Sequence, residues 1–137
     1  MNELRPLSSE ECVTLLSSKP VGRLVFTEDA MPAIRPVNFV LDSGGDIVVR
    51  VSSQGAIAKL SSEVVAFEAD EIDPVTHTGW SVVAVGKAEP IVGINELVEL
   101  ADPAHRPWAP GERARFLRIR VELLSGRLLT LGGALPR

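Results

Sequence analysis

The sequence predicts a mainly β protein, an antiparallel β-barrel of six or seven strands with two or three short helices. Apolar, β-branched segments recur along the chain and are joined mostly by short turns, which is typical of barrels. These strands do not alternate regularly with helices, which disfavours a doubly wound parallel sheet. The 137 residues, 45% of them hydrophobic and 23% charged, predict one globular domain over residues 1–137.

Composition excludes several classes of function. The net charge of -4 argues against nucleic acid as a partner, because nucleic-acid phosphates require a basic face. The absence of tyrosine and the 4% aromatic content also leave few surfaces for base stacking. No apolar run reaches the length of a membrane span, and the N-terminus has no signal-like apolar region, so we expect no membrane partner. The single cysteine, Cys12, fits a reducing compartment, and we expect a cytoplasmic protein.

Residues 1–20 are predicted to form an N-terminal helical lid. A capping box at residues 8–11 (SSEE) offers a serine hydroxyl and a glutamate to the first turn of a helix. Cys12, Leu15 and Leu16 then make one apolar face, and Pro20 ends the helix. Cys12 is interpreted as a core residue rather than a nucleophile, because no activating partner is evident.

Two strands are predicted next, at residues 21–27 and 33–41, with a turn at residues 28–31. Pro32 can start the second strand where no ladder N–H is required. Pro36 lies inside that strand and cannot donate to a ladder, so it predicts an edge or a bulge. A bulge would aim the neighbouring residues 35, 37 and 38 towards a site.

A β-hairpin is predicted around residues 42–46 (DSGGD), because a Gly-Gly pair between apolar runs supplies the positive φ angles of a tight turn. Its second strand, residues 47–51, runs into a polar segment. That segment combines cations, hydroxyls and a glycine, which are the groups that bind a phosphate ester. They are Arg50, Ser52, Ser53, Gln54, Gly55 and Lys59. The alternative is a solvated strand end with ordinary turn residues.

The remaining elements continue the β pattern. A short helix is predicted at residues 55–61, a strand at 63–70, and an apolar strand at 78–88. Residues 82–85 (VVAV) are apolar on both faces, so this strand is central or one of its faces meets another chain. A helix at 92–102 shows apolar residues at helical spacing and precedes a stiff proline-rich loop, DPAHRPWAPGE.

The C-terminal part is predicted as two strands. Residues 114–124 alternate cleanly, with Phe116 and Arg118 on one face and Leu117 and Ile119 on the other. Residues 125–126 (SG) are predicted to turn the chain into a last short strand at 127–131.

No residue pattern predicts a metal site or a nucleophile. His77 and His105 have no partners at metal-ligand spacing. Ser81 stands in no nucleophile elbow. Four carboxylates could bind a cation or could form a solvated strand end, and the second reading is favoured. These are Glu68, Asp70, Glu71 and Asp73. An enzyme of this composition would rely on a cofactor for its chemistry.

Five short segments in register resemble the pyridoxamine 5′-phosphate oxidase-like superfamily of flavin-binding split β-barrels, and especially its small, mostly actinobacterial branch. They are VGRL at 21–24, RPVNF at 35–39, IVVR at 47–50, VAFEAD at 65–70 and TGWSVV at 78–83. The resemblance implies a split barrel of the FMN-binding type and a homodimer with two cofactor sites at its interface.

The resemblance also implies where the cofactor lies. The flavin phosphate would lie near Arg50, Ser52, Ser53 and Lys59. The isoalloxazine ring would follow the strand from Arg35 through Pro36 and Val37 to Asn38. Trp80 and Ser81 would approach from the partner chain or from the adjoining strand.

This chain departs from the flavin-binding relatives in its phosphate segment. They typically carry a lysine about two residues after the glycine, where this chain has Ile57, and Lys59 lies two residues further on. Val51 occupies the place of the hydroxyl residue that usually follows the arginine.

Three functions are therefore weighed. The leading one is an FMN-dependent oxidoreductase acting on a small-molecule substrate. The second is an F420-dependent reductase on the same barrel, whose acidic cofactor tail would need extra cations. Candidates for those cations are Arg23, Lys87, Arg118 and Arg120. The third is a non-catalytic dimeric module that binds or stores flavin or haem.

Overall fold

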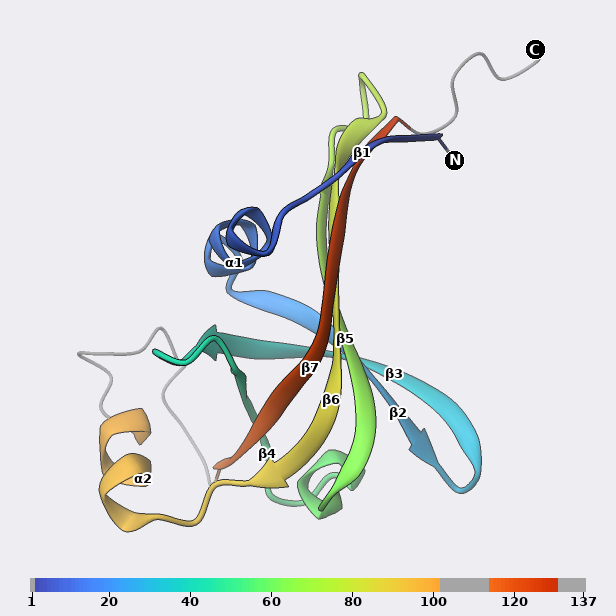
Figure 1. Ribbon diagram of the computed structural model, residues 1–137. Helices are drawn as coiled ribbons and strands as arrows, with labels where there is room; N and C mark the ends of the chain where they lie inside the picture. The colour runs from blue at the N-terminus through green and yellow to red at the C-terminus, as the bar shows by residue number, and fades with distance from the viewer. Residues whose placement is uncertain (1, 102–113, 131–137) are drawn as a thin grey trace.

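The computed structural model describes residues 2–101 and 114–130 and contains seven strands, two α-helices and one 3₁₀-helix (Figure 1). In chain order the elements are β1 (Asn2–Pro6), α1 (Ser9–Ser17), β2 (Val21–Glu28), β3 (Met31–Leu41), β4 (Ile47–Ser52), η1 (Ala56–Lys59), β5 (Glu63–Ile72), β6 (Thr78–Pro90), α2 (Ile94–Ala101) and β7 (Ala114–Thr130). None of the helices in this part of the chain is long and apolar enough to cross a membrane.

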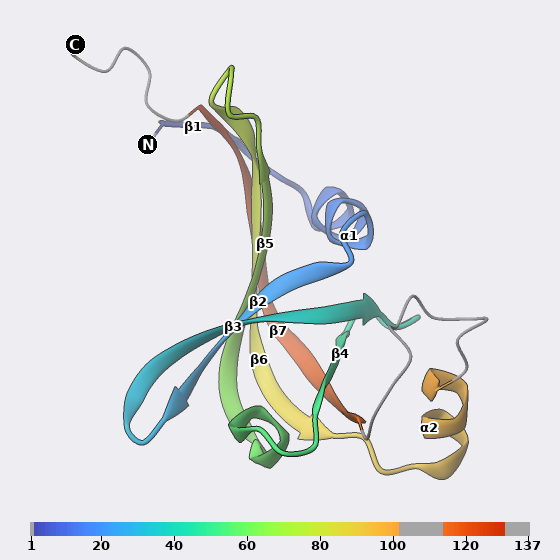
Figure 2. The ribbon, with the colours of Figure 1, turned by 180° about the vertical axis from the view of Figure 1, so that it is seen from behind.

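The strands form one antiparallel sheet in the order β1-β7-β4-β3-β2-β5-β6, and a further pairing of β7 with β6 closes it into a ring. The predicted antiparallel barrel is therefore confirmed. Figures 1 and 2 show β5, β6 and β7 as a long twisted ribbon, with the β2–β3 hairpin projecting from its lower half. Closure leaves the ring without a free edge over most of its circumference.

Helix α1 begins at the predicted capping box. The Glu11 N–H donates to Ser8 Oγ at 3.1 Å, and the Ser8 N–H donates to Glu11 Oε1 at 2.9 Å. Cys12 and Leu16 are buried against the barrel, so the helix covers it as predicted and Cys12 is a core residue. The prediction of a helical lid over residues 1–20 missed β1, which pairs with β7 and so is held by a partner far away in sequence.

The predicted turn at residues 125–126 is wrong, because β7 is one continuous strand of 17 residues. It pairs with β6 along almost its whole length, and this pairing keeps the chain extended through Gly126. Gly126 instead allows α1 to pack closely on β7, since a Cβ atom at this position would lie 2.7 Å from Cys12 Sγ. The last residue of the predicted strand at 127–131, and the proline-rich loop with His105 and Trp108, lie outside the described residues.

The predicted clean alternation of residues 114–124 fails at a β-bulge. Val85 pairs with Leu123 but the next residue, Gly86, pairs with Val121, so one extra residue lies in β7. The bulge exchanges the two faces of the strand. Leu117 and Ile119 are buried before it, whereas Leu123 beyond it is 67% exposed.

The predicted hairpin joins β3 and β4, with Asn38 opposite Arg50 and Leu41 opposite Ile47. Only the second glycine of the turn, Gly45, has a positive φ, at 87°. The Asp42 carboxylate accepts hydrogen bonds from the N–H groups of Gly44 and Asp46 and so fixes the turn. Only the last four residues of β3, 38–41, pair with β4, so Pro36 lies beyond that pairing, at an edge and without a bulge.

The core fills the ring and contains mostly aliphatic side chains around one aromatic pair. Phe39 and Phe67 meet edge to face, with ring centroids 4.7 Å apart. A smaller cluster holds α2 against the sheet through Val48, Leu100 and Phe116. The β6 face carrying Val82 and Ala84 points into the main core, and these two side chains are fully buried.

Candidate functional site

A cavity of about 580 Å³ lies where β2, β3 and β4 meet the segment that follows β4. It is lined by Val21, Phe26, Glu28, Arg35, Pro36, Val37, Asn38, Arg50, Val51, Ser52, Gly55, Ala56 and Ile57. Six of the ten residues predicted to bind a cofactor therefore lie around one cavity: Arg35, Pro36, Val37, Asn38, Arg50 and Ser52. This size suits a nucleotide-sized ligand.

Arg50 is a cation that lines this cavity and forms no ion pair with any other residue that the structure describes. It lies near the end of β4, between Asn38 on β3 and Phe116 on β7. Its side chain is half-buried, and none of the carboxylates that the structure describes forms an ion pair with it. A partly desolvated guanidinium that faces an open cavity is suited to bind an anion, because its fork of N–H groups matches two oxygens.

The last residue of β4, Ser52, and the segment after it line the same cavity as Arg50. Ser52 Oγ accepts a hydrogen bond from the Gln54 N–H at 3.2 Å, and its carbonyl accepts one from the Gly55 N–H at 3.3 Å. Gly55 has an ordinary φ of -89°, so its contribution to the cavity is the space left by the missing side chain. Ser53 is half-buried and Lys59 is exposed on η1, and neither lines the cavity.

A second charged group lies at the other end of the cavity. Arg35 Nη2 is 3.4 Å from Glu28 Oε1, and its guanidinium carbon lies 5.8 Å from the centroid of the Phe26 ring. Phe26 and Glu28 also line the cavity, and the sequence did not predict them as site residues. The available signal was the hairpin itself, because pairing β2 with β3 brings these residues alongside Arg35.

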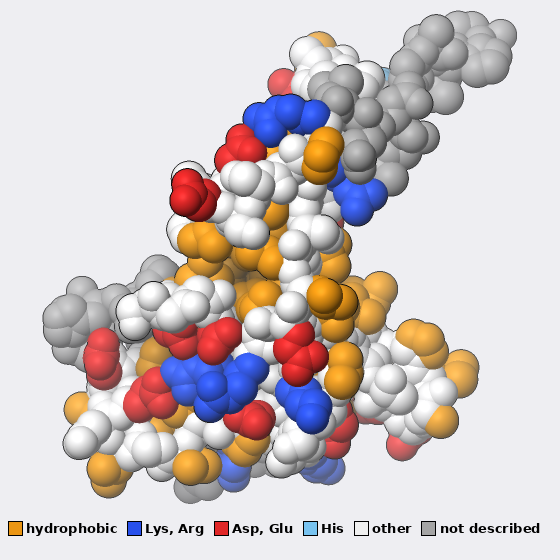
Figure 3. All heavy atoms as spheres, in the orientation of Figure 1, with side chains coloured by type: hydrophobic (Ala, Val, Ile, Leu, Met, Phe, Trp, Pro, Cys, Tyr) orange, Lys and Arg blue, Asp and Glu red, His pale blue; other side chains and the backbone are white. Residues whose placement is uncertain are grey.

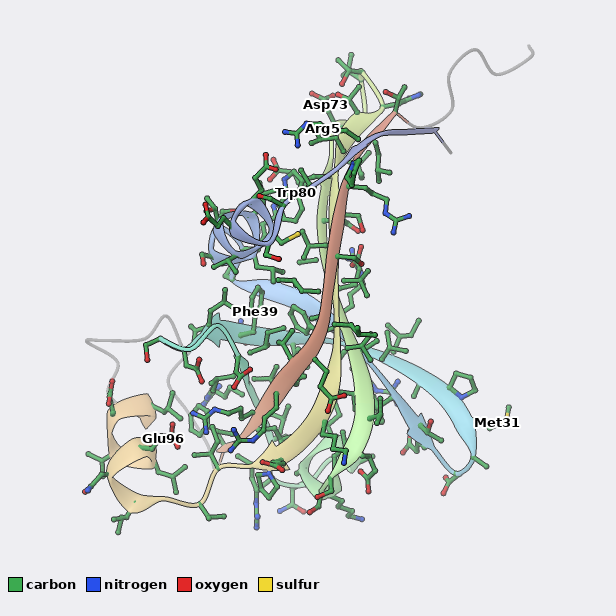
Figure 4. The ribbon with its side chains drawn as sticks, viewed as in Figure 1. Arg5, Met31, Phe39, Asp73, Trp80 and Glu96 are labelled. Atoms are coloured by element: carbon green, nitrogen blue, oxygen red, sulfur yellow. The ribbon has the colours of Figure 1, made fainter. Side chains whose placement is uncertain are left out.

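Trp80 and Ser81 do not reach the cavity of their own chain. Trp80 is 9% exposed and belongs to the main core, and Figure 4 shows it beside α1. Ser81 lies on the opposite face of β6, where its Oγ is 3.5 Å from Glu68 Oε2. Neither residue therefore approaches the cavity from an adjoining strand of its own chain, and an approach from a partner chain stays a prediction.

An apolar row crosses the outer face of the sheet beside this cavity. Five side chains from five neighbouring strands lie directly opposite one another: Ile34, Val25, Ala66, Val85 and Leu123. Ile34 in this row is 59% exposed. Val83 lies two residues before Val85 on the same face of β6, so it belongs to the adjacent row, and it is half-buried. Pro36, which lines the cavity, belongs to that adjacent row through its pairing with Arg23. The cavity therefore reaches the border of the apolar face.

The acidic residues of β5 and its following turn are engaged with protein groups. Asp73 Oδ1 accepts hydrogen bonds from the N–H groups of Thr76 and Val75, and these bonds lower the pKa of Asp73. Glu71 pairs with Lys19 at 2.9 Å, and Glu68 pairs with Arg23 at 2.8 Å. Within residues 2–101 and 114–130, no three His, Cys, Asp or Glu side chains are grouped to hold a metal ion.

Comparison with known proteins gives relatives along almost the whole chain. A family model for pyridoxamine 5′-phosphate oxidase matches residues 8–128. An uncharacterised protein of Mycobacterium tuberculosis, Rv0080, is 36% identical over 129 residues, which cover 90% of this chain and 84% of that protein.

Solved structures agree with this assignment. An FAD-binding protein of Mycobacterium smegmatis superposes with a TM-score of 0.79 at 29% identity, covering 93% of this chain and 100% of that one. An FAD-binding protein of Mesorhizobium loti gives a TM-score of 0.70 at 25% identity, covering 91% of this chain and 97% of that one. The chain therefore belongs to the pyridoxamine 5′-phosphate oxidase-like family of split β-barrel proteins.

Proposed function

We propose that the cavity binds a flavin nucleotide and that Arg50 holds its phosphate. The single observation that carries this proposal is the half-buried Arg50, which faces the cavity and has no described carboxylate partner. Ser52 adds a hydroxyl beside it, and the cavity wall from Pro36 to Asn38 offers a surface for a planar ring. The FAD-binding relatives at 29% and 25% identity support a flavin as the ligand.

The activity that we propose is an FMN-dependent oxidoreductase acting on a small molecule. The flavin supplies hydride transfer at its N5 atom when it is bound. The chain would supply the rest: Arg50 and Ser52 anchor the phosphate, and the strand with Val37 and Asn38 supports the ring. One phosphate-binding end suits the monophosphate FMN, while the FAD-binding relatives make FAD the ligand against which FMN must be compared.

We further propose a homodimer in which a second copy covers the apolar row and closes the cavity. The row ends in two exposed apolar side chains, Ile34 at 59% and Leu123 at 67% exposure, which a second copy could cover. In an isologous dimer the same row on both copies would be self-complementary. The second copy would also bring its Ser81 face close to the cavity border at Pro36.

Three of the cations considered for an F420 tail are already paired. Arg23 binds Glu68 and Asp70, Arg118 binds Asp42 and Glu96, and Arg120 binds Glu89. Figure 3 shows this interspersion of basic and acidic side chains on the lower part of the molecule. The carboxylates beside these arginines would repel a polyanionic tail, so we prefer FMN to F420.

A non-catalytic module that binds flavin or haem is the alternative function, and it would use the same cavity.

A cytoplasmic location is proposed on the ground that the single cysteine, Cys12, is buried and unpaired.

The test is spectroscopic. The purified protein is expected to absorb near 450 nm, or to quench flavin fluorescence when FMN, FAD and riboflavin are titrated into flavin-free protein. FMN binding tighter than riboflavin binding supports the phosphate site, and equal affinities would contradict it. Oxidation of NADH or NADPH by the loaded protein would distinguish an oxidoreductase from a storage module.

A further inference from the structure

The outer face of the sheet carries a small polar cluster directly beside the apolar row. Arg23 on β2, Glu68 on β5 and Val83 on β6 lie opposite one another in the row next to that of Val25 and Ala66. Arg23 Nη1 is 2.8 Å from Glu68 Oε1 and 3.3 Å from Asp70 Oδ2. One guanidinium is therefore shared by two carboxylates at the border of an apolar surface.

Glu68 is the member of this cluster that is placed to respond to pH. Its side chain is 25% exposed, whereas that of Arg23 is 54% exposed. The pKa of Glu68 is raised to about 7, chiefly by burial and next by the adjacent Asp70 carboxylate, while Arg23 acts in the opposite direction. The groups around it are Pro36 on β3, Arg23 on β2, Asp70 on β5, Ser81 and Val83 on β6, and Arg127 on β7, opposite Ser81.

We propose that Glu68 makes the association of two copies through this face depend on pH, so that the dimer forms more tightly below neutral pH than above it. This inference rests on the homodimer proposed above. A second copy seated on the apolar row would take the adjacent Glu68 further from water. Removing water disfavours the charged carboxylate, so association would be coupled to proton uptake.

The direction of the effect follows from linkage. A carboxyl group whose pKa rises on burial favours the buried state while it is protonated, and this contribution is lost as the pH rises through its pKa. The dissociation constant of the dimer is therefore expected to increase between about pH 6 and pH 8.5. If association raises the pKa of Glu68 by one unit, the dissociation constant of the dimer changes by about tenfold for each protomer.

The experiment is sedimentation velocity on flavin-free, full-length protein at several concentrations from pH 5.5 to pH 8.5. The wild type is expected to show a dissociation constant at least about tenfold larger at pH 8.5 than at pH 5.5. Glu68→Gln, which carries a permanently neutral side chain of the same size, is expected to remain dimeric across the range. Circular dichroism at each pH verifies that the variants are folded.

Three further variants make the test specific. Asp70→Asn removes the neighbouring negative charge and is expected to move the transition to lower pH. Arg23→Gln removes the opposing cation and is expected to move it to higher pH. Glu71→Gln is the matched control, because Glu71 is on the same strand, 65% exposed and paired with Lys19, and it should follow the wild type.

The outcomes separate this inference from the proposed function. A dimer whose dissociation constant does not change with pH, or an identical change in Glu68→Gln, would overturn the role of Glu68. A monomer at every pH would overturn both the dimer and the pH dependence. Flavin titration of the same samples at pH 5.5 and 8.5 reports separately on the cavity, so flavin binding can stand when the role of Glu68 falls.

Discussion

Gly22 lies against the tip of the Phe67 ring in the core of the barrel. A Cβ atom added at Gly22 would come within 2.2 Å of Phe67 Cζ and within 2.9 Å of two further ring carbons. Phe67 is fully buried and also packs against Phe39, which restricts the movement of its ring. The barrel therefore closes over this ring only because β2 has no side chain at position 22.

Gly22→Ala is expected to destabilise the fold by about 1–3 kcal/mol or more, because it overpacks a rigid aromatic ring. Urea unfolding followed by circular dichroism measures the change. Gly93→Ala is the control, since a Cβ at Gly93 meets nothing within 4 Å, and it should stay within about 0.5 kcal/mol of wild type. Gly22→Ala combined with Phe67→Leu should recover part of the loss; if the double variant shows the full sum of the two single losses, the clash is not the cause.

Arg50→Ala is expected to weaken FMN binding strongly and Arg50→Lys partially, because lysine keeps the charge but loses the two-pronged fork. Truncating one partner of a desolvated charge pair costs about 2–5 kcal/mol, or about 30- to 5,000-fold in affinity. Fluorescence quenching measures the dissociation constants.

Two comparisons make the Arg50 result interpretable. Riboflavin has no phosphate and should bind wild type and Arg50→Ala about equally. Lys59→Ala should change FMN affinity by about 1 kcal/mol or less, because Lys59 is exposed and does not line the cavity. If Arg50→Ala binds FMN as tightly as wild type does, the phosphate lies elsewhere.

Trp80→Ala is expected to destabilise the protein by about 3–5 kcal/mol, since Trp80 is 9% exposed and part of the main core. Thermal unfolding measures the loss. Met31→Ala is a suitable control, because Met31 is 66% exposed at the projecting hairpin and should change stability by at most about 0.5 kcal/mol (Figure 4). An unchanged melting temperature with reduced flavin affinity would instead assign Trp80 to recognition alone.

Glu11, at the start of α1, makes the stability of the folded state depend on pH. The hydrogen bond from Arg5 and the one from the Ser8 N–H hold the pKa of Glu11 at about 2. A depressed carboxyl pKa stabilises the folded state above the unfolded pKa near 4.5, and this contribution is lost as the pH falls towards 2. Glu11→Gln should therefore lower the melting temperature at pH 7, and the difference should vanish near pH 2.

The control for this pH series is Glu10→Gln. Glu10 is exposed and forms no ion pair with another described residue, so its substitution should have little effect at either pH. A difference between wild type and Glu11→Gln that persists at pH 2 would show that the loss arises from packing or helix propensity.

Local rules predicted the parts of the fold that local interactions determine. The capping box at Ser8 and the glycine turn at Gly45 both lie where the residue types indicated, because a few adjacent residues satisfy their own backbone groups. Arg50 and Ser52 were predicted for the same reason, since both lie near the end of one hairpin strand.

The missed features depend on partners that are far away in sequence. β1 has no strong alternating pattern of its own and is a strand because it pairs with β7. Gly126 resembles a turn residue, yet it is small because Cys12 of α1 packs against it. Phe26 and Glu28 reach the cavity only through the pairing of β2 with β3. Propensity gives way to tertiary context at each of these places.

The position of β7 in the ring has a consequence for synthesis. β7 is the last strand of the described chain, yet it is the partner of β1, β4 and β6. Until the ribosome has released it, these strands keep unpaired edges and the apolar inner face of β6 stays open to water. At about 5–20 residues per second, its 17 residues take about one to three seconds to make. The nascent chain therefore cannot close its barrel progressively, and a chain that stops before residue 114 would expose those edges to aggregation or to a chaperone.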